Sequence, residues 1–419
     1  NEVTIFRAQS DGQGGWSKPA PWLRTSYPFG VGPYNHGASH IAEGPDGFLY
    51  VSNGARTDGN EAGQSDLYFK GGEVPTTATL WRLDPEASTP QIEVFARGLR
   101  NPQSLLFTEN GDLLTGDNDC DKGDEERLVH VVEGGDSGWR VGYQHAPMGN
   151  AGSWNRERLW LPRFPGQPAN SLAPLANLED GPSGITYYPG TGLNDSYRGT
   201  LFITTFVGNV SRSGVFAYKL KPNGATYAVD KAERFLGGAL PTDVKFGPDG
   251  RLYWTDWADG WPKSKRGRIY AVSDPAHAND PIIAETKALI AADLTKKSIA
   301  ELSALLGHAD MRVRRSAQFE LAARKTEGLT ALAAVAAKAD SAPYARLHAL
   351  WGLGQLAAKN PAALTTLAAL ATDSDSEVRA QSIKLLGDHR VASAYPLLVT
   401  ALADSSDRVK FFAAQSLGK

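Results

Sequence analysis

Short apolar runs separated by glycine-containing turns dominate the chain up to residue 272. The same order recurs four times: a short strand, a turn with glycine, an apolar and aromatic strand, and a polar loop. The turns and second strands of these units span residues 44–54, 108–118, 196–206 and 247–257, and further strands are expected at 79–83, 215–220 and 268–272. Repeated units of this kind are typical of a β-propeller. A β-sandwich of irregular strands does not explain the repeated order.

This topology predicts where distant polar residues meet. If each first strand runs from the top of the wheel to its bottom, the second strand returns to the top. Loops before first strands and after second strands then gather on one face around the axis. We therefore expect His36 and Arg100 to share one mouth with the loops at 53–60, 117–125, 206–212 and 256–261.

Four units and one leading strand at residues 3–7 are fewer than a usual wheel contains. The leading strand completes the last blade in one alternative. In the other, roughly two further blades lie upstream, which we expect because an open propeller exposes strand edges. The fold class predicted is an incomplete β-propeller of a six-bladed type.

Helical spacing of alanine and leucine replaces the strand pattern from residue 281 onward. Pairs of apolar helices are joined by turns rich in aspartate and serine, and second helices open near Val313, Tyr344, Val378 and Val409. These points are 31, 34 and 31 residues apart, a spacing found in helical solenoids. We expect Asp310, Asp373 and Asp404 to cap the second helices.

Composition supports two domains, residues 1–276 and 277–419, because nine of the ten tryptophans lie at or before Trp261. A net charge of −3 argues against nucleic acid as the main partner. The sequence lacks an apolar run long enough to span a membrane, and its first residues lack an apolar signal core, so we expect any export signal to have been removed. A single cysteine, Cys120, excludes an internal disulfide framework.

An acidic loop at residues 117–125 is the strongest chemical signal. Carboxylates crowded around Gly123 repel one another unless a cation neutralises them, and oxygen-rich loops suit calcium. A solvated acidic turn is the alternative. The predicted metal ligands are Asp117, Asn118, Asp119, Asp121, Asp124 and Glu125.

His36 and Arg100 are the candidate catalytic residues. The small neighbours of His36 leave its imidazole accessible, and a neutral histidine there could remove a hydroxyl proton. A structural histidine, or a metal site shared with His40, stays open. Arg100 is a fixed cation that suits a carbonyl or carboxylate oxygen, with a salt bridge between blades as its alternative. Three tryptophans either stack on a sugar ring or fill a blade edge: Trp254, Trp257 and Trp261.

Three motifs in order resemble the soluble glucose/sorbosone dehydrogenase family, six-bladed propellers that use pyrroloquinoline quinone (PQQ) and calcium. His36 precedes the glycine turn at Gly44 by eight residues, as the family pattern requires. Residues 100–103 match its RNPQG corner up to Ser104, and residues 124–125 with 134–139 match its acidic loop and GGNYGW segment. The resemblance covers roughly residues 31–272, and the second part resembles HEAT repeats. The combination resembles large exported bacterial proteins that often carry a c-type haem domain.

The resemblance implies roles for individual residues. His36 would be the general base, Arg100 would hold a quinone oxygen, and residues 117–121 would offer oxygens to calcium. The cofactor-binding positions implied are Asn101, Gln103 and Arg212. Arg212 would replace a family lysine that lacks a clear counterpart here. Two family arginines are replaced by Leu240 and Thr242, and the calcium-holding glycine and proline by Asp119 and Cys120.

The expected function is an exported, calcium-binding quinone-type dehydrogenase that oxidises a hydroxyl of a sugar or polyol. It would work in the periplasm or outside the cell, with a cytochrome c as electron acceptor and the HEAT array as a docking arm for proteins. One alternative is a non-catalytic carbohydrate- or protein-binding module with structural calcium. The other is a polysaccharide-cleaving enzyme that uses His36 as base and Arg100 to neutralise charge.

Overall fold

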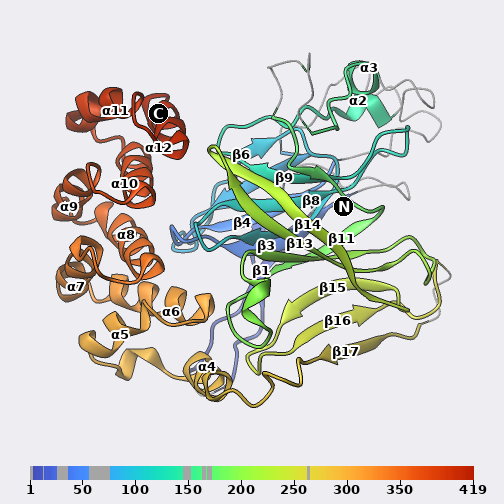
Figure 1. Ribbon diagram of the computed structural model, residues 1–419, viewed down its shortest axis with the longest axis horizontal. Helices are drawn as coiled ribbons and strands as arrows, with labels where there is room; N and C mark the ends of the chain where they lie inside the picture. The colour runs from blue at the N-terminus through green and yellow to red at the C-terminus, as the bar shows by residue number, and fades with distance from the viewer. Residues whose placement is uncertain are drawn as a thin grey trace.

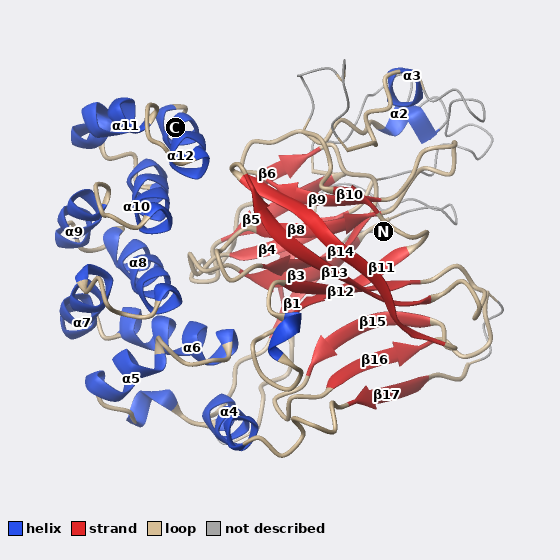
Figure 2. Ribbon diagram, in the orientation of Figure 1, coloured by secondary structure: helices blue, strands red, loops and turns tan. Residues whose placement is uncertain are grey.

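A computed structural model describes residues 3–12, 14–25, 36–55, 76–144, 152–162, 167, 172–261 and 265–419. Antiparallel sheets make up the first part of the chain, and a curved array of helices stands along one edge of these sheets (Figures 1 and 2). The predicted fold class, a propeller arrangement followed by an α-solenoid, is confirmed.

Each propeller unit is an antiparallel sheet whose strands follow chain order. The first two sheets are β3 (Ala38–Glu43), β4 (Leu49–Asn53), β5 (Thr79–Leu83) and β6 (Glu93–Arg97), then β7 (Pro102–Phe107), β8 (Leu113–Asp117), β9 (Arg127–Val131) and β10 (Ala176–Asn177). The last two are β11 (Pro182–Tyr187), β12 (Thr200–Thr205), β13 (Gly214–Asn223) and β14 (Thr226–Gly237), then β15 (Pro241–Phe246), β16 (Leu252–Asp256) and β17 (Arg268–Val272).

The first strands β3, β7, β11 and β15 line a central cavity of about 420 Å³, and residues of helix α6 (Met311–Ala323) line it as well. In three of the four sheets a tight turn joins the first strand to the second, and each of these turns has a glycine in the left-handed region of backbone space. Gly47, Gly111 and Gly250 have φ values of 87°, 78° and 74°, which other residues adopt only with strain. These turns face the helices, and we call the edge that they form the turn edge (Figure 1).

The leading strand β1 (Thr4–Arg7) pairs with β2 (Ala20–Arg24) in a separate two-stranded sheet. Leu23 of this sheet packs against Val51 and Trp81 of the first four-stranded sheet. The alternative in which the leading strand completes the last blade is therefore wrong, because β1 pairs with β2 and, among the described strands, β17 pairs only with β16. The sequence APWLR of β2 contains proline and lacks alternation, so its strand was not predicted.

Residues 273–280 connect β17 to the helices. The array contains α4 (Pro281–Ala291), α5 (Ile299–Leu305), α6, α7 (Thr326–Ala337), α8 (Pro343–Ala357), α9 (Ala362–Leu370), α10 (Ser376–Asp388), α11 (Tyr395–Ala401) and α12 (Asp407–Leu417). Helices α6, α8, α10 and α12 form an inner row beside the turn edge, and α5, α7, α9 and α11 form an outer row (Figure 1). Two short helices, α2 (Val141–Gln144) and α3 (Ser153–Arg156), lie in the propeller part. Among the described residues, no helix has the length and apolar character needed to cross a membrane.

The predicted helix caps are correct at one position and wrong at two. Asp310 caps α6 by accepting a hydrogen bond from the Arg312 N–H. The caps of α10 and α12 are Asp375 and Ser406 instead of Asp373 and Asp404. Those two aspartates accept hydrogen bonds from arginines of the preceding repeat: Arg346 bonds to Asp373 at 2.6 Å, and Arg379 to Asp404 at 2.8 Å. Asp373 and Asp404 therefore form charge-assisted bonds between repeats, whereas the sequence pattern predicted that they would cap helices.

Candidate functional site

A buried carboxylate holds the corner that precedes β7. Asp117, the last residue of β8, accepts hydrogen bonds from the backbone N–H groups of Arg100 and Asn101 at 3.0 and 2.8 Å. It also forms a 2.5 Å ion pair with Arg127 at the start of β9, and the two side chains are only 1% and 2% exposed. Asp117 therefore anchors the corner within the protein.

The last blade repeats this arrangement. Asp256 ends β16, accepts the Leu240 N–H at 2.8 Å and pairs with Arg268 of β17 at 3.1 Å. An aspartate at the end of a second strand thus ties the loop before the first strand to the start of the third. The repetition indicates that the position of Asp117 serves blade architecture.

His36 lies beside the same corner, as the topology predicts. Its backbone N–H donates to Ala55 O at 3.3 Å, and Ala55 N–H donates to Arg100 O at 2.7 Å. Gly54 allows this approach, because a Cβ there would lie 2.3 Å from Cβ of His36 and 3.3 Å from Oδ1 of Asn101. Burial and the charge of Arg100 lower the pKa of His36 to about 3, so its imidazole is neutral near pH 7.

Two buried polar atoms at this corner lack a hydrogen-bond partner among the described residues: Nδ1 of His36 and Nη1 of Arg100. The other guanidinium nitrogens of Arg100 are engaged, because Nε donates to Gln144 Oε1 at 2.9 Å and Nη2 lies 3.5 Å from Asp121 Oδ2. Leaving buried donors and acceptors unpaired costs free energy. The pair is therefore suited to a guest molecule with oxygen atoms.

The acidic loop is largely organised by its own carboxylates. Asp124 is buried and accepts hydrogen bonds from the Cys120 N–H at 3.0 Å and the Trp154 indole at 2.8 Å. Burial, together with the charges of Asp124 and Asp121, raises the pKa of Asp119 to about 7. Of the six predicted metal ligands, Asp117 and Asp124 are thus committed to protein donors.

The other predicted ligands lie at or near the surface of the loop. Asp121 and Glu125 are exposed, while Asn118 is half-buried and donates its N–H to Asn101 O at 3.4 Å. Within the described ranges, no group of three or more histidine, cysteine, aspartate or glutamate side chains could hold a metal ion. The side chains therefore do not form a carboxylate cage for calcium here.

The predicted cofactor-binding residues occupy different environments. Asn101 is buried beside His36, and Gln103 is half-buried in β7 at a bulge between Pro102 and Ser104. Arg212 is exposed and pairs with Asp180 at 3.1 Å. No described contact joins Arg212 to His36 or Arg100. Parts of the predicted mouth, in the 53–60 loop and just before His36, lie outside the described residues.

Sequence reasoning missed two residues that contact this corner and its loop. Glu126 is buried, accepts the Gly181 N–H at 3.2 Å, and has a pKa raised to about 8 by burial and by Asp119. Glu126 follows Glu125 in an acidic run, so nothing in the sequence singled it out. The alternation of buried and exposed positions leading into β9 could have indicated that Glu126 is buried and Glu125 is not. Gln144, which binds Arg100, carried no signal in the sequence.

The three predicted tryptophans divide between the two alternatives. Trp254 stacks on Tyr270 of the neighbouring strand with ring centres 5.1 Å apart and fills a blade edge. Trp257 and Trp261 flank Phe206 at 6.1 and 4.9 Å, and Trp261 is 70% exposed. An exposed aromatic group thus stands on loops of the predicted mouth.

Solved structures with a similar chain path include sugar dehydrogenases. A glucose dehydrogenase matches at 20% identity and a TM-score of 0.45, over 65% of this chain and 73% of that one. The PQQ-bound aldose sugar dehydrogenase of Streptomyces coelicolor matches at 20% identity and 0.43, over 64% and 71%. The apo-form soluble aldose sugar dehydrogenase of Escherichia coli matches at 17% identity and 0.42, over 65% and 74%.

Family models divide the chain as the two architectures do. HEAT repeats match residues 299–383 and 329–418. A search of curated proteins found no match. The model described as Glucose / Sorbosone dehydrogenase matches residues 4–261, which is more than half of the chain. The protein therefore belongs to the glucose/sorbosone dehydrogenase family.

Proposed function

We propose that this protein oxidises a hydroxyl group of a sugar or polyol with a PQQ-type quinone. The observation that carries the proposal is that two buried atoms beside one corner of the propeller, His36 Nδ1 and Arg100 Nη1, have no hydrogen-bond partner among the described residues. One is an acceptor for a proton and the other is a cationic donor for an oxygen. Family membership supports this class of reaction.

His36 is the general base of the proposed reaction. Its neutral imidazole takes the proton of the substrate hydroxyl at Nδ1. A bound quinone would supply the two-electron oxidant, which accepts a hydride from the carbon that carries this hydroxyl. The guanidinium of Arg100 holds an oxygen of the guest and stabilises negative charge that develops there. Asn101 and Gln103 complete the cofactor side of the proposed site, with Arg212 as a further cation.

Calcium is proposed with a smaller set of ligands than the sequence indicated. Asp117 and Asp124 serve protein donors, and the remaining oxygens, of Asn118, Asp119, Asp121 and Glu125, are not gathered into a metal-binding group in the described structure, so a bound calcium would have to draw them together. A cation there would offset the burial and the neighbouring charges of Asp124 and Asp121, which together raise the pKa of Asp119. No step of the proposed reaction is routed through it.

We also propose that the protein works in the periplasm or outside the cell and passes its electrons to a cytochrome c. A second candidate function is a non-catalytic carbohydrate-binding module. The exposed rings of Trp257 and Trp261, which flank Phe206, favour it, because sugars stack on exposed aromatic faces.

A dye-reduction assay with a sugar panel tests the proposal, with PQQ and calcium added together or separately. We expect turnover that needs PQQ, and a loss of about 10²–10⁴-fold in kcat for His36→Ala with an unchanged melting temperature. His277→Ala is the matched control, since His277 lies near the interdomain connection and pairs with Asp280. Absence of turnover with every sugar, although PQQ raises the melting temperature, would contradict the dehydrogenase and favour the binding module.

A further inference from the structure

Glutamines of the inner helices bind the propeller turns. Each of α6, α8, α10 and α12 contains one glutamine, and each side-chain amide donates to a backbone carbonyl of the propeller. The bonds are Gln318 to Pro45 O (2.7 Å), Gln355 to Pro45 O (3.2 Å), Gln381 to Asn110 O (3.0 Å) and Gln415 to Glu133 O (3.2 Å). Consecutive repeats therefore bind successive parts of the turn edge.

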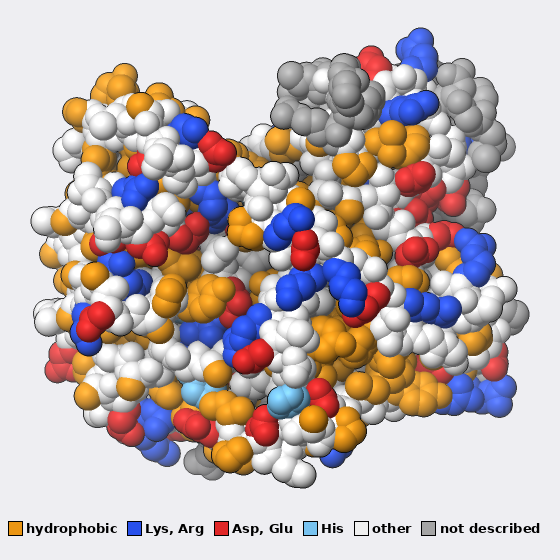
Figure 3. Space-filling view, in the orientation of Figure 1, with side chains coloured by type: hydrophobic (Ala, Val, Ile, Leu, Met, Phe, Trp, Pro, Cys, Tyr) orange, Lys and Arg blue, Asp and Glu red, His pale blue; other side chains and the backbone are white. Residues whose placement is uncertain are grey.

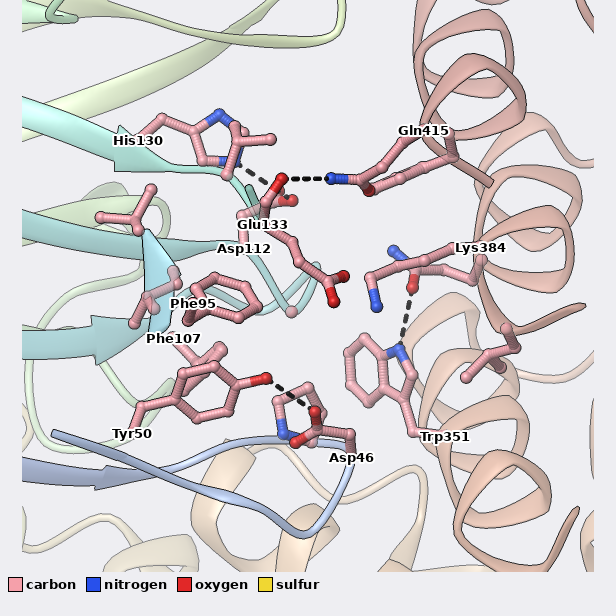
Figure 4. A pocket seen from close by; sticks show the side chains of 18 of the residues that line it. Asp46, Tyr50, Phe95, Phe107, Asp112, His130, Glu133, Trp351, Lys384 and Gln415 are labelled. Carbon is pink, nitrogen blue, oxygen red and sulfur yellow. Dashed lines mark hydrogen bonds and ion pairs between the residues drawn. The ribbon is translucent and has the colours of Figure 1, made fainter. Parts of the chain in front are cut away.

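Helix α8 orients two of these amides. Its His348 Nδ1 lies 2.8 Å from Oε1 of Gln318, and its Trp351 indole donates to Oε1 of Gln381 at 3.0 Å. The indole also covers Gly111, where a Cβ would lie 2.8 Å from the ring. Figure 4 shows Trp351 facing the propeller side chains across the junction. Preorganised amides of this kind lose little side-chain freedom when they bind.

Ion pairs cross the same junction. Arg314 pairs with Glu109 at 2.7 Å, with side chains 3% and 6% exposed. Arg408 pairs with Asp112 at 3.0 Å, and Lys419 pairs with Glu133 at 2.5 Å. Figure 3 shows charged side chains of both signs spread over the outer face of the molecule, whereas these junction pairs are largely buried. Such pairs resist separation, because removal of one partner leaves a buried charge.

The third sheet extends to reach the array. Strands β13 and β14 have 10 and 12 residues, whereas the other strands of the propeller sheets have two to six. The tip of this hairpin meets α12, where Arg408 Nη1 donates to Ala225 O at 3.2 Å. Arg312 donates to Phe246 O of the last sheet at 2.8 Å. All four propeller sheets with described first strands thus contact the array.

Strands β8 and β9 connect this junction to the candidate site. Asp112 immediately precedes β8, whose other end is Asp117. Arg127 begins β9, and Glu133 follows its last residue by two positions. Five residues of strand span about 16 Å. The contacts of Arg408 and Lys419 therefore lie at one end of these two strands. The carboxylate of Asp117, which binds the backbone N–H groups of Arg100 and Asn101, lies at the other end.

We propose that the HEAT array is an internal brace whose inner row has the chain's own propeller as its partner. It holds the sheets by their turn edge and, through β8 and β9, positions the corner that carries Arg100. Between the first two sheets and helices α8, α10 and α12 the cavity is about 60 Å³, room for a few water molecules, so this part of the junction is not a small-molecule pocket (Figure 4). These statements do not depend on dehydrogenase activity.

Cleavage of the connection tests the brace in the full chain. A protease site placed within residues 274–280 lets the folded protein be cut between β17 and α4. We expect the two pieces to elute as one particle from a sizing column at physiological salt and to separate only in denaturant. Separation of the pieces at physiological salt would overturn the proposal.

Hydrogen exchange tests the link to the candidate site. The variant Gln318→Ala/Gln355→Ala/Gln381→Ala/Gln415→Ala removes the four amides, and Thr330→Ala/Thr400→Ala on the outer row is its matched control. We expect exchange at least tenfold faster for the Gly111 amide and for the Arg100 and Asn101 amides in the glutamine variant, and unchanged exchange in the control. Faster exchange at Gly111 with unchanged exchange at Arg100 and Asn101 would overturn the positioning role. If the glutamine variant fails to fold, the single variant Gln381→Ala is measured in the same way.

Discussion

The two edges of the propeller pair their buried charged groups to different extents. At the turn edge, arginines and lysines of the array pair with Glu109, Asp112 and Glu133, although Nε of Arg314 has no partner among the described residues. At the edge that carries His36 and Arg100, one nitrogen of each side chain is buried without a partner among the described residues.

This difference separates stability from function. Paired groups at the turn edge hold sheets and helices together, whereas unpaired groups at the other edge keep a capacity for binding at a cost in stability. The corner stays in place because Asp117 and Arg127 below it are fully paired. Variants that remove one of these side chains at either edge test the comparison.

The largest effect on stability is expected for Arg127→Met. The change leaves the carboxylate of Asp117 buried without its ion pair and removes the bond from Arg127 to Ser137 O. Loss of one member of a buried pair costs about 3–5 kcal/mol, which urea unfolding measures. Arg198→Met at an exposed pair is the control, with an expected cost below about 1 kcal/mol. Equal costs for the two variants would contradict the structural role of the pair.

A somewhat smaller loss is expected for Arg408→Ala at the turn edge. Asp112 and Glu377 both lose a charge-assisted bond, but the junction admits some water, so we expect about 2–3 kcal/mol. Lys410→Ala on the same helix is the control, because its pair with Asp407 is exposed and worth less than about 0.5 kcal/mol. A cost for Arg408→Ala below that of the control would show that the ion pair does not stabilise the junction.

The pH dependence of stability is expected to change in His36→Gln. The unfolded histidine binds a proton below its ordinary pKa of 6.5, whereas the folded one does so only near 3. The free energy of unfolding is therefore unaffected by this titration above pH 6.5 and decreases as the pH drops toward 3. At pH 5 the loss is about 1–2 kcal/mol. The melting temperature of the variant should fall less between pH 7 and pH 5 than that of the unmodified protein. Parallel curves would mean that the folded His36 is protonated at pH 5.

The smallest effect on stability is expected for Arg212→Ala. Its pair with Asp180 is exposed on both sides, so the free energy of unfolding should change by less than about 0.5 kcal/mol. Calorimetric titration with PQQ then reports its predicted role in cofactor binding without interference from folding. Affinity weakened about tenfold would support that role, and equal affinity would remove Arg212 from the proposed site.

Much of the architecture could be predicted from local patterns. Glycine turns, strand periodicity and the spacing of helix pairs act over a few residues, so the four propeller units and the helix pairs followed from them. The strands β2 and β10 could not be predicted, because APWLR and the two-residue strand Ala176–Asn177 lack a period and form only where a neighbouring strand supplies hydrogen bonds. Asp373 and Asp404 show the same limit, since arginines of other repeats compete for them.

The candidate site shows this division most clearly. The sequence by itself determined that His36, Arg100 and an acidic loop belong to one end of the blades, because strand direction alternates along the chain. Only the tertiary structure decided which of these groups are already bonded to other groups of the protein. Asp117 pairs with Arg127 of the next strand and Asp124 accepts the Trp154 indole, while His36 and Arg100 each keep one nitrogen without a partner in the part of the chain that the structure describes. Pairing between distant groups depends on packing to within an ångström, and such packing is a property of the whole fold.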